Sequence, residues 1–169
     1  MTGIDTVAPL AAIQDVHRAA HSIRRHLEHE VLQPHDLTWT LWAVLWVAWR
    51  RGEIEAHELA VEAGVAKPTL TGALDSLETR GLASRRVHPD DRRRVLVALT
   101  PTGEALMSAL LPLVAAEETA LTSTLTPDER RVLWTSLRKV VAVIDEAAPL
   151  ATESATGTAT ATETAPRSR

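Results

Sequence analysis

The stretch LETRGLASRRVHPDDRRRVLVALTPTG, residues 77–103, decides the fold of this 169-residue chain. Gly81 closes a helical pattern, and two short extended runs follow at residues 82–87 and 95–99. The polar run HPDDRRR lies between them at residues 88–94. Two extended runs around a polar turn predict a β-hairpin with a charged tip.

Two short helices are predicted directly before this hairpin. Residues 56–63 have a two-turn helical pattern that Gly64 closes, and residues 67–80 have a second pattern that Gly81 closes. Apolar residues of the second helix share one side, namely Leu70, Ala73, Leu74 and Leu77. Two helices around a tight turn predict a helix-turn-helix, and the hairpin makes it a winged helix. The predicted fold class is mainly α with a small β-wing.

Longer helices are predicted on both sides of the winged core. Residues 10–32 are amphipathic, and residues 38–51 are apolar nearly all round. Thr100-Pro101 opens a helix that reaches about residue 124, and the capping box Thr126-Pro127-Asp128-Glu129 opens another that reaches about 148. These helices expose more apolar surface than a small monomer covers, so we expect a homodimer.

The domain organisation follows from these patterns. One domain is predicted over residues 10–148. Both flanking segments are predicted to be disordered, because residues 1–9 have no sustained periodicity and residues 149–169 have almost no large apolar group. The predicted parts are the disordered N-terminus 1–9, the winged helix-turn-helix at about 53–100, the dimerisation helices at about 10–32 and 101–148, and the Thr/Ala-rich tail 149–169.

Composition narrows the class of protein. There is no cysteine, so disulfides and thiolate metal sites are excluded, and no apolar run is long enough for a membrane span. No signal peptide is apparent, and we expect a cytoplasmic protein. The net charge is −4, yet residues 67–94 hold seven basic and four acidic residues, so this segment is +3 and the remainder is −7. Local positive charge marks the segment expected to meet phosphates.

The ordered run of Leu77–Leu82, Arg85-Arg86, Asp90–Arg93 and Val95–Gly103 resembles the MarR family of winged helix-turn-helix transcriptional regulators. The resemblance covers about residues 10–148. It implies a homodimer whose recognition helices enter successive major grooves of a pseudo-palindromic operator, with each wing in an adjacent minor groove. It also implies a repressor that a small ligand releases, such as a phenolic or aromatic carboxylate.

The recognition helix supplies the first predicted DNA contacts. Lys67, Thr69, Thr71 and Gly72 lie in its first two turns, away from the apolar side. Many family members have serine or threonine where this helix begins, whereas this chain has Ala66-Lys67-Pro68. The usual phosphate contact by a cap hydroxyl is therefore not expected here.

The wing supplies the other predicted DNA contacts. Arg93 is predicted to enter a minor groove, because a guanidinium suits the negative potential there. Asp91, two residues earlier, is predicted to hold it by a bidentate salt bridge, the part that this Asp-x-Arg pair plays in the resembled family. Arg92 and Arg94 face the other way and are predicted to contact phosphate or to remain solvated. Arg85 is a further predicted DNA-binding residue.

An effector site is predicted on the first helix. His17, His21 and Arg24 fall near the edge of its apolar face and could bind a carboxylate beside Trp39 or Trp42. The paired histidines could instead form half of a zinc site, which would make a zinc-responsive regulator. The third interpretation leaves the histidines as surface groups and the tryptophans in the core. No cofactor or resident metal is predicted.

The sequence also bears on two other functional classes. Enzymatic activity is not expected, because HRAAH at residues 17–21 lacks the glutamate of a His-Glu-x-x-His protease and no phosphate loop or nucleophile motif is present. A winged-helix module that binds protein rather than DNA is the alternative within the same fold.

Overall fold

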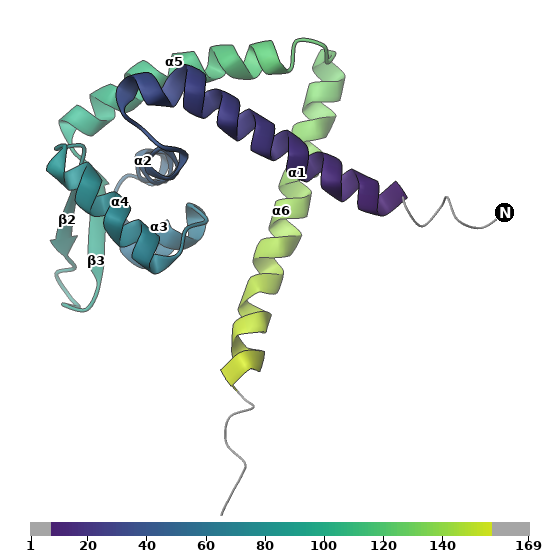
Figure 1. Cartoon of the computed structure of the whole chain (residues 1–169). Coiled ribbons are helices and arrows are strands. Elements are labelled where there is room, and N and C mark those ends of the chain that lie inside the picture. The colour runs from purple at the N-terminus through teal and green to yellow at the C-terminus, as the bar shows by residue number, and fades with distance from the viewer. Residues whose placement is uncertain (1–7, 157–169) are drawn as a thin grey trace, which may run out of the picture. The chain divides into compact units, whose positions relative to one another are not determined.

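The computed structural model describes residues 8–156 (Figure 1). Contacts divide the chain into two units, one up to Leu121 and one from Thr122 onward. Most of the two predicted disordered ends, residues 1–7 and 157–169, lies outside the described residues. The first helix begins at Ala8 and the last ends at Thr156, so both extend past the predicted limits of 10 and 148. A single domain over residues 10–148 stays a prediction.

The N-terminal helix changes its winding before it ends. α1 covers Ala8–Leu27, a π-helical turn (η1) covers Glu28–Leu32, and a 3-10 turn (η2) covers Gln33–His35. Asp36 then adopts the left-handed conformation, with a φ of 54°. The predicted helix over 10–32 is confirmed, but the π turn within it was not predicted.

The tryptophan-rich helix α2 covers Trp39–Arg51. The Thr38 hydroxyl caps it by accepting the N–H of Leu41 at 3.3 Å, and Gly52, with a φ of 69°, ends it. Leu45 is fully buried and Val44 nearly so, so α2 is the centre of the core. The stacked rings of Trp42, Trp46 and Trp49 run along this helix, with centroids 5.9 and 5.7 Å apart.

The winged helix-turn-helix follows in the predicted order. α3 covers Ala56–Glu62, α4 covers Lys67–Thr79, and the wing strands β2 and β3 cover Ala83–Val87 and Val95–Leu99 (Figure 1). Gly64 and Gly81 have φ values of 64° and 66°, the left-handed conformation that glycine adopts without steric cost.

The sheet has one strand more than the sequence predicted. Ile54–Glu55, interpreted as a link, forms β1 and pairs with β3 in antiparallel register, Ile54 with Val97 and Glu55 with Leu96. The strand order is β1-β3-β2, so β3 is the central strand. A segment of two residues is too short for an alternating pattern to identify it as a strand. Only its pairing with β3 defines it as one.

One hydrophobic core holds the first unit together. Leu59 of α3, Leu77 of α4, Val97 of β3 and Met107 of the following helix are all fully buried around α2. That following helix, α5, covers Pro101–Leu121. Its first half therefore belongs to the winged core, although its sequence pattern alone marks it as a dimerisation helix.

Gly103 marks the point where α5 meets the wing. A Cβ added at residue 103 would overlap the backbone carbonyl oxygen of Leu82. The N–H of Thr100 donates to that same carbonyl at 3.1 Å, and the Thr100 hydroxyl accepts the N–H of Gly103 at 3.1 Å. The predicted hydroxyl cap at Thr100 is thus present, and the glycine is required by packing.

The second unit contains α6, which covers Pro127–Thr156. The predicted capping box is confirmed: the Thr126 N–H donates to the Glu129 carboxylate at 2.8 Å, and the Glu129 N–H donates to the Thr126 hydroxyl at 3.3 Å. Within the described residues, no helix combines the length and apolarity that crossing a membrane requires.

Replacing Gly103 by alanine should destabilise the first unit severely. The new methyl group must displace a backbone carbonyl, so we expect a loss of several kcal/mol in the free energy of unfolding, as for other overpacked core positions. Urea denaturation at fixed protein concentration measures this. Gly72→Ala is the matched control, because Gly72 also lies in a helix and a Cβ there meets nothing within 4 Å. It should be neutral or stabilising by up to about 1 kcal/mol; equal losses in the two variants would contradict the close-approach argument.

Candidate nucleic-acid interface

The first turns of α4 present the predicted polar residues to solvent. Lys67, Thr69, Thr71 and Gly72 are exposed, while Leu70, Ala73, Leu74 and Leu77 are buried. The Thr71 hydroxyl donates to the Lys67 carbonyl at 3.1 Å. Ala66 occupies the N-cap position and provides no side-chain cap, as its sequence implies. The exposed face is therefore available for base edges, and DNA contact by its residues stays a prediction.

The wing tip contains the predicted Asp-x-Arg pair. The Arg93 guanidinium donates to both Asp91 oxygens, from Nε at 3.2 Å and from Nη2 at 3.3 Å. The Arg93 N–H donates to the same carboxylate at 3.0 Å. These bonds hold the pKa of Asp91 below its ordinary value, and the Arg93 side chain is still 90% exposed. Asp91 thus orients Arg93 while leaving it accessible.

Arg85 is turned toward the recognition helix. Its guanidinium binds Glu78 of α4 from Nε at 2.9 Å and from Nη2 at 2.5 Å, and it reaches Asp75 at 2.6 Å. The Arg85 N–H also donates to Glu78 at 2.8 Å. These bonds raise the pKa of Arg85 and lower that of Glu78. Arg85 therefore joins β2 to α4, and its predicted contact with DNA remains untested.

Arg92 and Arg94, which were predicted to contact phosphate or to remain solvated, differ in their partners. Arg94 donates to Glu55 of β1 from Nε at 2.8 Å and from Nη2. Arg92 is exposed and has no hydrogen bond or ion pair within residues 8–156. The arginines of this run therefore have different surroundings: Arg93 binds Asp91 and Arg94 binds Glu55.

Arg86 forms a further pair that the sequence did not indicate. Its guanidinium binds Glu53, which directly precedes β1, at 2.5 and 2.6 Å. This bond lowers the pKa of Glu53 and raises that of Arg86. Glu53 and Glu55 alternate around the buried Ile54, but three residues are too few for this alternation to assign a strand from the sequence.

A cavity of about 760 Å³ opens between α3, α4 and the wing. Five of the nine predicted DNA-contacting residues line it, namely Lys67, Thr71, Arg85, Arg93 and Arg94. Its apolar wall includes Ala56 and Val61 of α3 and Leu70 of α4. The structure thus gathers cations from both predicted reading elements around one partly apolar space.

The predicted effector residues are not gathered in this way. His17, His21 and Arg24 are exposed on α1, whereas Trp42 is buried in the core and Trp39 packs against it. Arg24 lies 3.8 Å from Glu28, which also accepts the backbone N–H of Trp39 at 2.8 Å. No group of three metal-binding side chains occurs among the described residues. The zinc alternative remains untested. The effector role of these five residues remains untested.

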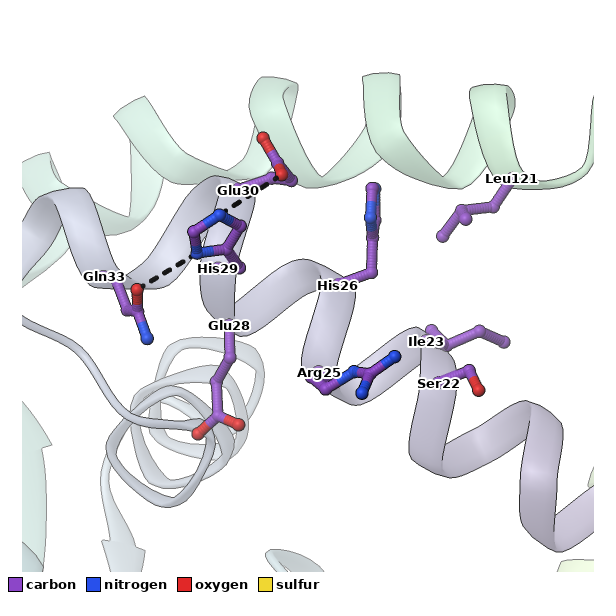
Figure 2. A pocket seen from close by; sticks show the side chains of 9 residues that line it. All are labelled: Ser22, Ile23, Arg25, His26, Glu28, His29, Glu30, Gln33 and Leu121. Carbon is purple, nitrogen blue, oxygen red and sulfur yellow. Dashed lines mark hydrogen bonds and ion pairs between the residues drawn. The ribbon is translucent and has the colours of Figure 1, made fainter.

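A second cavity, of about 640 Å³, lies beside the end of α1 (Figure 2). None of the five predicted effector residues lines it; its walls come from the last turns of α1, the π turn, Gln33 of η2 and Leu121 of α5. His26 points to α5 in Figure 2, where it binds Glu117 at 2.7 Å, and His29 contacts Gln33 and Glu30. Most polar side chains of this cavity have a protein partner, whereas Ser22 and Arg25 have none among the described residues.

Comparison with known proteins decides the family. The MarR family model matches residues 37–95. The uncharacterized HTH-type transcriptional regulator YwaE of Bacillus subtilis is 31% identical over 126 residues, which cover 75% of this chain and 74% of YwaE. The chain belongs to the MarR family. It is a DNA-binding transcriptional regulator with a winged helix, as the resemblance implied.

Solved MarR-family structures share this fold. A mutant MarR from Escherichia coli complexed with operator DNA matches with a TM-score of 0.69 and 32% identity, over 83% of this chain and 99% of that one. Bordetella bronchiseptica BpsR, whose DNA binding is regulated by 6-hydroxynicotinic acid, matches with a TM-score of 0.69 and 25% identity, over 77% of this chain and 98% of BpsR.

Replacing Glu78 by glutamine should weaken the link between α4 and β2. A carboxylate with a lowered pKa stabilises the fold above its ordinary pKa of 4.5, and that contribution disappears as the pH falls through the lowered value. At pH 7 we expect a loss of roughly 1 kcal/mol or less, since the pair is part-exposed, and the gap to the parent should be smaller at pH 3 than at pH 7.

Urea denaturation at both pH values measures this difference at fixed protein concentration. Glu58→Gln is the matched control, because Glu58 is exposed and has no bonded partner within the described part of the chain. A loss at pH 7 no larger than that of the control would contradict the proposed link.

Proposed function

We propose that this MarR-family regulator is a cytoplasmic homodimeric repressor that binds a pseudo-palindromic operator and leaves it when a small aromatic acid binds. The observation that carries the proposal is the exposed Arg93, held at both oxygens of Asp91, beside a recognition helix whose first turns are open to solvent. α4 has the length to lie in a major groove, and the wing tip presents a guanidinium suited to a narrow minor groove.

Exposed apolar side chains support the homodimer. In the first unit, Ile13 and Val16 of α1 and Leu113 of α5 are each about half exposed or more. In the second unit, α6 exposes Val132 and Ile144 to a similar extent. Side chains of this kind are stabilised when a second subunit removes them from water, and a two-fold dimer presents two recognition helices to two half-sites.

The cavity between α3, α4 and the wing supports the aromatic acid. Its volume falls in the range of small-molecule sites, and its apolar wall faces the cations of Arg85 and Arg93. An aromatic ring would pack against Ala56 and Val61 while its carboxylate binds a guanidinium. BpsR, whose regulator is an aromatic acid, provides the parallel within the family.

Replacing Arg93 by alanine should reduce operator affinity by about tenfold to a hundredfold, the effect of losing one groove contact per subunit. Fluorescence anisotropy with the duplex of highest affinity selected from a random pool measures this. The dimer, measured by sedimentation, should persist because the wing tip is far from the exposed apolar helices in sequence and is itself solvated.

Asp91→Asn provides the companion variant. It retains Arg93 but weakens its support, so we expect a smaller loss of affinity than in Arg93→Ala. Arg93→Ala binding duplex DNA as well as the parent does would overturn the wing assignment.

Replacing Ala56 by leucine should block the effector while retaining DNA binding. The larger side chain fills part of the cavity without changing its charge. We expect 6-hydroxynicotinic acid or benzoate to release DNA from the parent, and the half-effective concentration to rise about tenfold in the variant, equivalent to about 1.4 kcal/mol.

Benzyl alcohol is the matched probe, because it has the aromatic ring without the carboxylate and should not release DNA. Thermal melting checks that the variant remains folded. Equal release by benzyl alcohol, or an unchanged half-effective concentration in the variant, would place the effector elsewhere.

A further inference from the structure

Two carboxylates outside the predicted DNA-contacting set bind arginines of the wing. Glu53 binds Arg86 with two bonds, and Glu55 binds Arg94 with two bonds. Both acids precede or belong to β1, while their partners lie 33 and 39 residues farther along the chain. The pairs therefore depend on the pairing of β1 with β3.

The register of the sheet explains why these four side chains meet. Glu55 is opposite Leu96, and Leu96 is opposite Arg86, so the three residues share one face. Glu53 and Arg94 are each two residues from a member of this row and fall on the same face. Arg85 has the opposite parity and reaches Asp75 and Glu78 of α4 instead.

These pairs change the electrostatics of the DNA-binding region. Residues 53–94 hold seven basic and eight acidic side chains, a balance of −1, although residues 67–94 alone are +3. Four of the five arginines between residues 85 and 94 have a carboxylate partner. Arg92 has none among the described residues.

We propose that Glu53 and Glu55 act as internal phosphate mimics that hold Arg86 and Arg94 away from the DNA backbone. A carboxylate occupies both donors of a guanidinium in the same bidentate way as a phosphate does. Sequence-independent affinity grows with the number of phosphates that a protein neutralises, so each arginine held in this way reduces non-specific binding.

When these two arginines are held away from phosphates, the preference for one DNA sequence depends mainly on the recognition helix and Arg93. The ratio of operator binding to non-specific binding decides how a regulator distributes itself over a genome. Removing a mimic should therefore raise affinity for every duplex and lower that ratio. The inference rests on the proposed DNA interface and assigns two further specificity-determining residues to it.

The test compares Glu55→Gln with Glu58→Gln in salt titrations. The two variants lose the same charge, but only the first releases an arginine, because Glu58 has no bonded partner in the described part of the chain. On a duplex of scrambled sequence, Glu55→Gln should steepen the dependence of log affinity on log salt by about 0.9 per subunit. Glu58→Gln should leave this slope at the parent value, and Glu53→Gln should behave as Glu55→Gln does.

A double variant identifies the released group. Glu55→Gln with Arg94→Ala should return the slope to the parent value, since the freed guanidinium is gone. Both pairs are partly exposed, so these variants should fold as the parent does, which circular dichroism checks. The ratio of the affinity for the operator to the affinity for the scrambled duplex should fall several-fold in Glu55→Gln.

Two results would overturn this inference without affecting the proposed function. The first is an equal salt slope in Glu55→Gln and Glu58→Gln. The second is a salt slope that Arg94→Ala reduces as much as Arg92→Ala does. The second result would mean that Arg94 already binds phosphate in the parent. A parent that binds no duplex would overturn both the proposed function and this inference.

Discussion

The contact between Leu82 and Gly103 is the constraint on which the arrangement of the first unit depends. The Leu82 carbonyl packs against the Gly103 backbone and accepts the N–H of Thr100, while the Leu82 N–H donates to Leu77 at 2.8 Å. The Thr100 hydroxyl donates to the Gly81 carbonyl at 2.5 Å. The end of α4, both ends of the wing and the start of α5 thus meet within a few residues. The start of α5 is thus in direct contact with the segment that joins the recognition helix to the wing.

Ion pairs hold the wing against the rest of the first unit. Arg85 ties β2 to α4, and Arg86 and Arg94 tie the two wing strands to the segment before α3. Each pair is partly exposed and contributes little to the free energy of folding by itself. Together they join the wing to both helices of the helix-turn-helix. The same arginines would otherwise be available to phosphates, so shape and charge are linked in this region.

Sequence patterns predicted the elements that depend on local chemistry. Thr100 and Thr126 were predicted to begin helices, and each of their hydroxyls accepts the expected N–H. Asp91 and Arg93 are two residues apart, so their pair could also be predicted. By contrast, β1 has two residues and is defined only by its pairing with β3, which lies about 40 residues away. The partners of Arg86 and Arg94 depend on that pairing, so the sequence alone could not identify them.

The candidate effector site shows the same division between local and distant information. His17 and His21 share a helical face by spacing alone, but a cavity requires walls from several elements, and those walls depend on packing. The cavity beside the wing draws on α3, α4 and the hairpin, and includes Arg93. Under the proposed function, a ligand that binds Arg93 there would compete with DNA for the same group. Because such competition is reciprocal, tight operator binding would also weaken the effector, and release would require effector concentrations well above its affinity for the free protein.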